Sequence, residues 1–592
     1  MSRAAGILAC ACALAVLVLA AVLGHYAHPQ VDDLFRAARV RDLGVTGSVV
    51  LEYKTWSGRW LGTGLSYALS SRVDVRHCYG FLLAAVALAS LSATCLLVRG
   101  VLTNGPWRLA IAFGSILYAL LWTGLSDPGD SFYWLTGAIE NQFAIALGLA
   151  LFGWLLLMPA RAGGSAIRAA RLAGVAVAAF ALPGIHELYG AILLAALCVG
   201  ALTASARRDA RRAEWWLAVA GCVAGMAVVV FAPGNGVRMS EMPMRRSPAT
   251  LLRLVHLVPV LAGWIASPQL LAASGAFVLH PAVRRLRAPW TVSNIPWRWL
   301  IPAGTLAAEI FGFGACYWLV GGVPPRTFSA LYRLFLIGWF ATLFAWAARA
   351  GAGREPSSRE RSVWQICTLA LAIALLQAPT TLRAWDDLRW RARAYDEALR
   401  TRDRFLEAAD DLHAGVPALP TSPVLFFHAD VVNAPRDYRN FHYVMFYRLK
   451  SLQVDFVTGP EEPFSKAPSR GPGPEPPRSW PLSSLRTADD DSLASAEGVT
   501  RIVFRAPPGV STAVLRLRAV SSISTQTLEA RVNRVPVFVH RFQAAGEWHA
   551  FLSKAFTLRA GDNQLALRST PQVPEPGQPP PVRFGDMVLE SP

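Results

Sequence analysis

The stretch AAGILACACALAVLVLAAVL, residues 4–23, decides the fold class. It contains no charged residue, and a helix of about 20 apolar residues is long enough to cross the hydrocarbon core of a bilayer. A cleaved signal peptide is the alternative, because the run follows a single basic residue, Arg3, and is rich in alanine. We favour an uncleaved membrane helix, because the run is longer than the apolar part of a typical signal peptide.

The composition places the whole chain in the membrane class. Of its 592 residues, 53% are hydrophobic, and 20 tryptophans and 28 phenylalanines fit many lipid–water boundaries, where aromatic rings settle at headgroup depth. The net charge of +18 comes from arginines that lie in clusters between apolar runs. This pattern is typical of cytoplasmic loops. We therefore exclude nucleic acid as a partner and expect membrane lipid instead.

Ten further apolar segments of spanning length follow the first. They lie at roughly 79–99, 108–125, 138–158, 168–183, 185–204, 214–232, 257–280, 299–322, 328–348 and 362–381. Basic clusters separate alternate pairs, as at Arg207/Arg208/Arg211/Arg212. The positive-inside rule then predicts eleven helices with a cytoplasmic N-terminus, and an odd count places everything after residue 382 outside.

Asp32 and Asp33, soon after the first helix, are the candidate catalytic residues. A carboxylate at a partly dehydrated membrane surface has a raised pKa, which suits a general base that takes a proton from an acceptor hydroxyl. The alternative is that the pair caps a helix in the first outer loop, a role that aspartate fills well. The spacing alone does not separate the two interpretations.

Three arginines in the other outer loops are candidates for binding a phosphate: Arg59, Arg238 and Arg326. The guanidinium fork would stabilise the charge that develops on a departing phosphate oxygen. Asn235 belongs to the same prediction, because Pro233-Gly234-Asn235-Gly236 predicts a tight turn with exposed N–H groups beside Arg238. Each arginine has an alternative role as a headgroup anchor.

Five residues complete the candidate site as substrate-binding groups. Trp56 lies in the motif Trp56-Ser57-Gly58-Arg59-Trp60, and Trp134 and Glu140 could hold a sugar by stacking and hydrogen bonding. His186 and Glu187 lie between two apolar runs, where ionisable groups are expensive, and suggest a metal or acceptor site; a short water-exposed turn is the alternative. The eight cysteines show no CxxC spacing, so neither a disulfide framework nor a zinc cluster is predicted.

The chain changes character after the membrane domain, which we place at 1–382. A middle segment, 383–482, is predicted to hold one amphipathic helix at 383–413, short strands at 424–427 and 452–457, and a Pro- and Gly-rich linker at 459–482. A C-terminal domain, 483–592, shows eight alternating runs that predict an all-β sandwich. The runs are 502–505, 513–519, 527–532, 535–541, 548–552, 555–558, 564–568 and 582–589. The sandwich resembles jelly-roll carbohydrate-binding modules, and inert packing is the alternative role.

Several motifs together resemble GT-C-type glycosyltransferases, and in particular a glucosyltransferase-like family of bacterial multi-pass membrane proteins. They are His28-Pro29-Gln30-Val31-Asp32-Asp33-Leu34, Tyr53 to Trp60, Phe132 to Gly137, His186-Glu187 and Phe231 to Arg238. The resemblance covers about residues 1–450. It implies an inverting enzyme of the bacterial inner membrane that takes sugar from a polyprenyl-phosphate donor, with Asp32 or Asp33 as catalytic acid. Some members need a divalent cation. The family's second acid usually precedes an aromatic residue, whereas Leu34 follows here.

Three functions compete. The first is a glycosyltransferase acting on a cell-envelope glycan, a lipid-linked glycan or a protein at the outer membrane face. The second is a glycolipid transporter or flippase, which would place ionisable residues inside its helices; Glu309 is the main example we identify. The third is a non-catalytic scaffold for envelope polysaccharide assembly, anchored by its helices.

Overall fold

The chain folds into two compact units, which are described separately. The computed structural model describes residues 2–592 apart from 103–104, 159–164, 242–251, 286–295, 351–356, 410–411, 420–421, 433–436, 456–478, 482–498, 507–509, 522–525, 542–547, 561, 571–581 and 591–592. The first unit comprises residues 1–29, 39–392 and 423–427, and the second comprises 30–38, 393–422 and 428–592.

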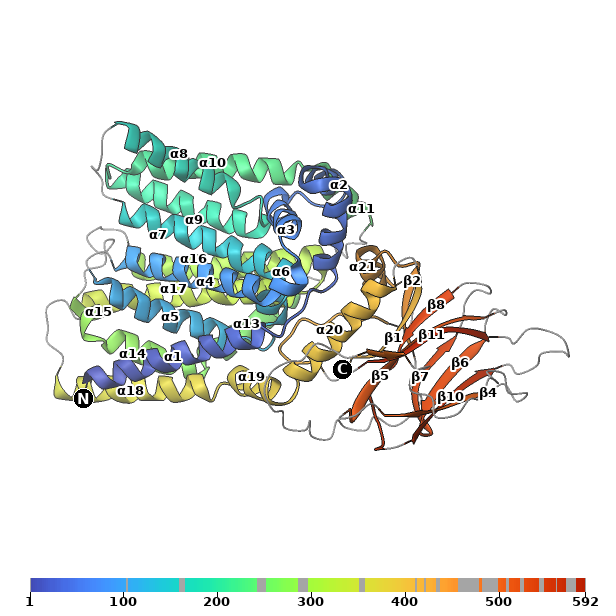
Figure 1. Cartoon of the computed structure of the whole chain (residues 1–592). Coiled ribbons are helices and arrows are strands. Elements are labelled where there is room, and N and C mark those ends of the chain that lie inside the picture. The colour runs from blue at the N-terminus through green and yellow to red at the C-terminus, as the bar shows by residue number, and fades with distance from the viewer. Residues whose placement is uncertain are drawn as a thin grey trace. The chain divides into compact units, whose positions relative to one another are not determined.

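The first unit is built from long apolar helices (Figure 1). Eight helical segments in the described part of the chain are long and apolar enough to cross a membrane. They are α1 (Ser2–Gly24), α4 (Val75–Val101), α6–η2–α7 (Leu135–Gly137, Ala138–Phe143, Ala144–Leu157), α9 (Glu187–Ala206), α10 (Arg212–Val230), α16 (Trp297–Val320), α17 (Pro325–Ala350) and α18 with α19 (Ser358–Leu376, Pro379–Trp390). This is the architecture of a multi-pass membrane protein.

A bent pair adds a ninth candidate span. Helices η3 (Leu252–His256) and α13 (Leu257–Ile265) meet α14 (Pro268–Leu279) at an angle of 60°. Proline at the first position of α14 explains the break, because it cannot donate a hydrogen bond into the preceding turn. The two remaining predicted segments are also helical, as α5 (Trp107–Thr123) and α8 (Ser165–Ala181), but each has 17 residues. At 1.5 Å per residue they are about 25 Å long, a little short of the ~30 Å core.

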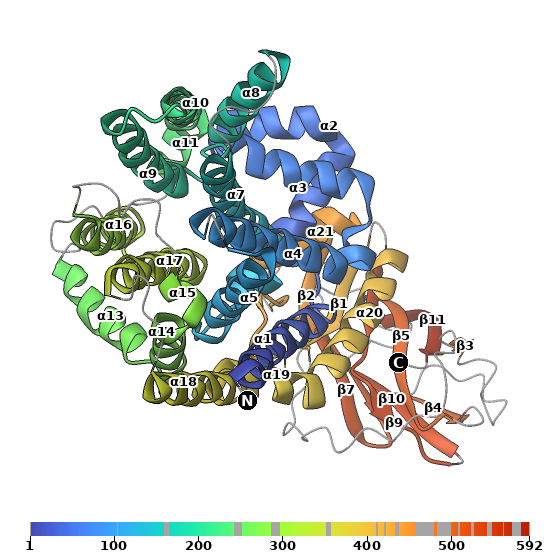
Figure 2. The same cartoon turned by 90° about the vertical axis from the view of Figure 1, so that its left-hand side faces the viewer.

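Close packing joins the helices of this unit. Figure 2 looks along them and shows α4, α5 and α7 between α8–α10 and α14–α17. At the crossing of α4 and α7, a Cβ added to Gly153 would lie 2.8 Å from the carbonyl carbon of Leu96. Small residues let membrane helices approach in this way, where no hydrophobic effect drives them together.

Helices also fill the segments predicted as outer loops. Helix α2 (Asp32–Thr55) is kinked at Gly44, whose φ of 68° suits glycine, and is followed by α3 (Trp60–Arg72). Further short elements are η1 (Gly129–Tyr133), α11 (Pro233–Glu241) and α15 (Pro281–Arg285). The two segments η1 and η2 are π-helical, a wider winding that is frequent at functional sites.

Two predictions for the middle segment are wrong. The single helix at 383–413 is two helices, α19 and α20 (Ala392–Ala408), and its predicted last residue, His413, opens strand β1 (His413–Pro417). The predicted strand at 424–427 is a turn, and its backbone N–H groups at Val424 and Leu425 donate to the Asp387 carboxylate. The predicted linker at 459–482 lies almost wholly outside the described residues.

The second unit contains two β-sheets. The larger has the order β2–β1–β8–β5–β11–β3, with β9 beside β5, and the smaller has the order β4–β10–β6–β7. The strands are β1 (His413–Pro417), β2 (Ser451–Asp455), β3 (Ser479–Pro481), β4 (Val499–Arg505), β5 (Thr512–Ser521), β6 (Thr527–Val532), β7 (Val535–Arg541), β8 (Trp548–Leu552), β9 (Phe556–Thr557), β10 (Asp562–Thr570) and β11 (Val582–Glu590). All eight strands predicted after residue 500 are confirmed.

The two sheets share a core of alternating side chains, including Phe504, Leu517 and Phe551. The other face of the larger sheet is covered by α20 and by α21 (Tyr438–Tyr447). Strands β1 and β2 come from the middle segment, yet β1 pairs in parallel with β8 of the C-terminal segment. The sheet therefore crosses the boundary that we predicted at residue 483.

Candidate functional site

The centre of the candidate site is Arg59, held between two glutamates. Its Nε and Nη2 donate to the two carboxylate oxygens of Glu187 at 2.7 and 2.8 Å, and its Nη1 donates to Glu140 at 2.6 Å. The side chain of Arg59 is 13% exposed and that of Glu187 is 42% exposed. Burial alone would lower the pKa of Arg59, but the carboxylates of Glu187 and Glu140 outweigh it and hold the pKa above its ordinary value.

Backbone contacts fix the position of Arg59 before its side chain is considered. The N–H groups of Leu61 and Gly62, in the first turn of α3, donate to the carbonyl oxygen of Gly184 at 2.9 and 3.1 Å. A Cβ on Gly184 would lie 2.6 Å from the indole of Trp60, so only glycine allows this approach. The turn before α9 is thereby locked to the start of α3, which brings Glu187 within reach of Arg59.

The π-helix η2 presents three consecutive polar side chains to different partners. Glu140 accepts from Arg59, Asn141 accepts from the hydroxyl of Tyr189 at 2.5 Å, and Gln142 accepts from Arg333. All three side chains are buried. Because buried polar groups are costly unless they are paired, this pattern fixes η2 against three neighbouring helices.

His186 is buried beside the cluster formed by Arg59, Glu140 and Glu187. Its ring stacks on Tyr189 with centroids 4.2 Å apart, and its Nδ1 lies 3.9 Å from the Glu187 carboxylate. Burial, followed by the positive charge of Arg59, lowers the pKa of His186 to about 3. The ring is therefore neutral at physiological pH, and the prediction of a water-exposed turn at this position is wrong for His186.

Arg238 approaches the cluster from α11. It lies over the ring of Trp56, with its guanidinium carbon 5.9 Å from the centroid. The side chain of Asn235 bonds to the backbone: its amide donates to the Val229 carbonyl at 2.7 Å and its oxygen accepts from the Gly58 N–H at 3.2 Å. Asn235 therefore ties α11 to the Arg59 loop, and its side-chain oxygen and amide are already engaged in these two bonds.

The electrostatic environment of Arg238 is unusual. In the described part of the chain, no carboxylate forms an ion pair with it. Its pKa is lowered first by burial and then by the positive charge of Arg59, while the carboxylates of Glu187 and Glu140 oppose the shift. An anion bound here would pair with a guanidinium that burial has partly desolvated.

Arg326 lies at the start of α17 and acts electrostatically on Arg238 and His186. Its guanidinium is 5.4 Å from the ring centroid of Trp134, whose other contact is a stacked Phe427 at 4.5 Å. Asp130 of η1 is a neighbour: burial raises its pKa, and the charge of Arg326 opposes the shift. Because Trp134 is buried and its ring contacts both Phe427 and Arg326, it positions Arg326 in this arrangement and offers no free face for stacking a sugar.

The predicted catalytic pair belongs to the second unit. Asp33 is buried, and its carboxylate accepts from the backbone N–H of Gln30 at 3.3 Å, which is a helix-capping contact at the start of α2. Asp32 is half-buried. The structure thus unites nine of the eleven predicted site residues in the first unit and leaves Asp32 and Asp33 outside that group.

In the described ranges, no group of three histidine, cysteine, aspartate or glutamate side chains could hold a metal ion. The need for a divalent cation stays a prediction.

Three residues that matter to the site were missed from the sequence. Tyr189 and Asp130 are ordinary in the linear chain, and only the fold brings them to the cluster. Arg333 carried a signal that we overlooked, because it lies inside the apolar segment 328–348 and is now seen buried in α17, over the ring of Tyr118 at 5.3 Å.

Comparisons with protein-family models, curated proteins and solved structures found no match to this chain.

Proposed function

We propose that this chain is an integral-membrane glycosyltransferase. It moves a sugar from a polyprenyl-phosphate donor to an envelope glycan, a lipid-linked glycan or a protein at the outer face of the bacterial inner membrane. The motifs that resemble GT-C enzymes support this proposal. In this proposal the bundle crosses the membrane eleven times, with α5 and α8 included, the N-terminus is cytoplasmic and the second unit is extracytoplasmic.

The environment of Arg238 is the observation that carries the proposal. A half-buried guanidinium with no ion-pair partner among the described carboxylates supports an anionic ligand, because the nearby Glu187 and Glu140 are already bound to Arg59. Arg59 was a donor-phosphate candidate, but two glutamates already occupy its fork. Arg238 and Arg326 are therefore the phosphate-binding pair, and Arg59 organises the site around them.

The reaction follows from these roles. A carboxylate takes the proton of the acceptor hydroxyl, the acceptor oxygen bonds to C1 of the sugar, and the bond from C1 to the phosphate oxygen breaks. The negative charge left on the polyprenyl phosphate is stabilised by Arg238 and Arg326. Either Asp32 or Asp33 is the base; we favour Asp32, because Asp33 is buried and engaged as a helix cap.

The β-sheets of the second unit are proposed to form a jelly-roll-like module that binds the acceptor glycan. The shared core of its two sheets supports a sandwich. The alternative role is assembly, in which the sandwich only recruits a partner.

A transfer assay tests the proposal. Membranes that contain wild-type protein or single Asp32→Asn, Asp33→Asn or Arg238→Gln variants are supplied with labelled polyprenyl-phosphate sugars, at matched protein abundance. We expect Arg238→Gln and one of the two aspartate variants to lose at least tenfold in transfer. Full activity in both aspartate variants would remove this assignment of the base.

A glycolipid transporter is the second candidate function, and a specific observation favours it. Arg333 and Glu309 are 3% and 1% exposed inside α17 and α16, and ionisable groups at such depth often line a transport path. Both carboxylate oxygens of Glu309 lack a hydrogen-bond partner among the described residues. Movement of labelled glycolipid across vesicles without transfer, abolished by Glu309→Gln or Arg333→Gln, would support this function instead.

A further inference from the structure

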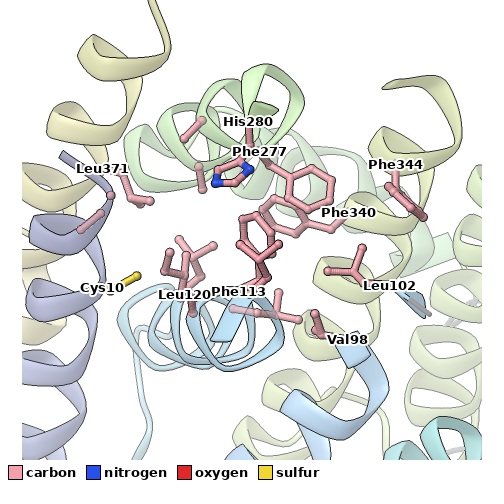
Figure 3. A pocket seen from close by; sticks show the side chains of 18 of the residues that line it. Cys10, Val98, Leu102, Phe113, Leu120, Phe277, His280, Phe340, Phe344 and Leu371 are labelled. Carbon is pink, nitrogen blue, oxygen red and sulfur yellow. The ribbon is translucent and has the colours of Figure 1, made fainter. Parts of the chain in front are cut away.

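A cavity of about 150 Å³ lies among the membrane helices of the first unit. Figure 3 shows the side chains that line it, which come from α1, α4, α5, α14, α17 and α18. The lining is almost entirely hydrocarbon, and its core consists of Leu97, Phe113, Leu117, Phe277, Phe340 and Leu371. An engineered apolar cavity of about this size stays dry and accepts benzene, so this space suits a short length of hydrocarbon.

Few polar side chains line this cavity, and no acidic residue, lysine or arginine is among the described lining residues. His280 borders it with its ring edge-on to Phe113 at 5.2 Å and to Trp364 at 5.6 Å. Cys10, Thr368 and Trp364 are the other lining residues with polar side-chain atoms. Nothing at the cavity wall therefore favours a charged or strongly polar occupant.

The cavity lies toward one end of the bundle. It is lined by the N-terminal half of α1, the last turns of α4, the C-terminal halves of α14 and α17, the middle of α18 and most of the length of α5. Along α17, Phe340 follows Pro325 by 15 residues, or about 22 Å. The candidate site lies near the Pro325 end, so the cavity belongs to the opposite leaflet.

Arginines accumulate at this end of the bundle. Among the residues whose side chains the structure describes, four arginines lie within one turn of a lining residue, Arg99, Arg108, Arg284 and Arg361, against one glutamate, Glu360. Arg284 pairs with Glu360 at 2.9 Å, whereas Arg108 is exposed at the start of α5. These arginines make this end of the bundle positively charged, which attracts anionic lipid.

We infer that this cavity binds one acyl chain of an anionic phospholipid whose headgroup lies against the arginines of the same leaflet. The occupant comes from the bilayer itself, because the six lining helices are membrane helices and a lipid chain needs no other entry path. Under the proposed topology this is the cytoplasmic leaflet, which carries the anionic lipids. The inference does not depend on the sugar-transfer proposal, because the two sites lie at opposite ends of α17.

Native mass spectrometry of the full-length protein tests the inference, with phosphatidylglycerol and phosphatidylethanolamine of matched chains as probes. Wild-type protein should bind the first phosphatidylglycerol molecule at least fivefold more tightly than phosphatidylethanolamine. Ala112→Phe and Ala341→Phe fill the cavity and should each weaken phosphatidylglycerol binding at least tenfold. Ala307→Phe is the matched control, because Ala307 is exposed on α16 away from the cavity.

The Arg108→Gln variant tests the contribution of the lipid headgroup separately from that of the acyl chain. It should reduce the preference for phosphatidylglycerol at least threefold and leave phosphatidylethanolamine binding unchanged. Equal binding of the two lipids by wild-type protein would overturn the inference, as would wild-type affinity in the cavity-filling variants. The Arg108 variant and the wild-type comparison need no change in the helix core, so the test survives if one filled variant fails to fold.

Discussion

At the scale of single residues, Arg59 shows what a linear motif can and cannot reveal. Its type and its place between Gly58 and Trp60 predicted a functional arginine in an outer segment. The sequence could not predict the partners of Arg59, because Glu140 and Glu187 are 81 and 128 residues away along the chain. A buried charge that looked like a ligand-binding group is, in the fold, the centre of a salt-bridge network.

Arg59→Ala is therefore expected to be strongly destabilising. It leaves two carboxylates buried or half-buried without their counter-ion, and breaking a buried pair in this way costs about 3–5 kcal/mol. Thermal unfolding of the full-length protein in lipid nanodiscs measures the loss. The triple variant Arg59→Met/Glu140→Gln/Glu187→Gln should recover part of it, because no buried charge is left unpaired.

The control for this prediction is Arg253→Ala. Arg253 is exposed and donates to the Gly321 carbonyl at 2.6 Å, so its loss should cost no more than about 1 kcal/mol. An equal cost for the two alanine variants would contradict the buried network.

At the scale of elements, the contacts between helices predict that a glycine-to-alanine substitution destabilises the protein at one position and not at another. Gly153→Ala places a methyl group 2.8 Å from backbone atoms of Leu96, so α4 and α7 must separate, at a cost of about 1–3 kcal/mol. Gly304→Ala, in α16, meets no atom within 4 Å and should be neutral or stabilising by about 0.5–1 kcal/mol. Nanodisc unfolding of both variants checks the pair, and a stable Gly153→Ala protein would show that α4 and α7 do not pack this closely.

Acid should weaken the second unit at strand β8. His549 stacks on His413 at 4.7 Å and lies 5.2 Å from His540, and its pKa is lowered to about 3 by burial and then by those two rings. The unfolded chain, with a histidine pKa near 6.5, binds protons more readily. Stability is therefore complete above about pH 6.5 and falls as the pH drops toward 3, by up to about 1.4 kcal/mol per pH unit.

Hydrogen exchange of peptides from β8 and β1, corrected for the intrinsic pH dependence, measures this effect. His549→Gln should flatten the profile between pH 6.5 and 4. Two of the groups that face the ring, His413 and His540, are themselves histidines, whereas Gln453, beside His540 at 3.0 Å, carries no charge; the comparison with His549→Gln therefore isolates the contribution of His549. An unchanged profile in His549→Gln would place the acid sensitivity elsewhere.

The elements also show where sequence patterns succeed. Alternating apolar residues predicted all eight strands after residue 500, and long apolar runs predicted the membrane helices, because each pattern reflects the environment of its own segment. Residues 413–417 failed for the opposite reason: they are a strand only because β2 and β8 pair with them. The site shows the same contrast. Nine of its residues were predicted from local motifs, whereas the contacts of Arg333, Tyr189 and Asp130 depend on the fold.

At the scale of the whole molecule, the proposed topology predicts opposite sides for two exposed serines. Single cysteines are introduced in a cysteine-free protein at Ser240, in α11 of the candidate site, and at Ser358, at the start of α18. An impermeant maleimide applied to intact cells should label Ser240→Cys, and should label Ser358→Cys only after permeabilisation. The reverse labelling would place the candidate site in the cytoplasm, where the proposed donor orientation fails.

The most direct test of the central claim is a binding titration of the purified full-length protein with polyprenyl phosphate and with the uncharged polyprenol. We predict that polyprenyl phosphate binds at least tenfold more tightly than polyprenol, and that Arg238→Gln removes this difference while Arg253→Gln preserves it. Equal affinity of wild-type protein for the two lipids, or an Arg238→Gln variant that still selects the phosphate, would contradict the account.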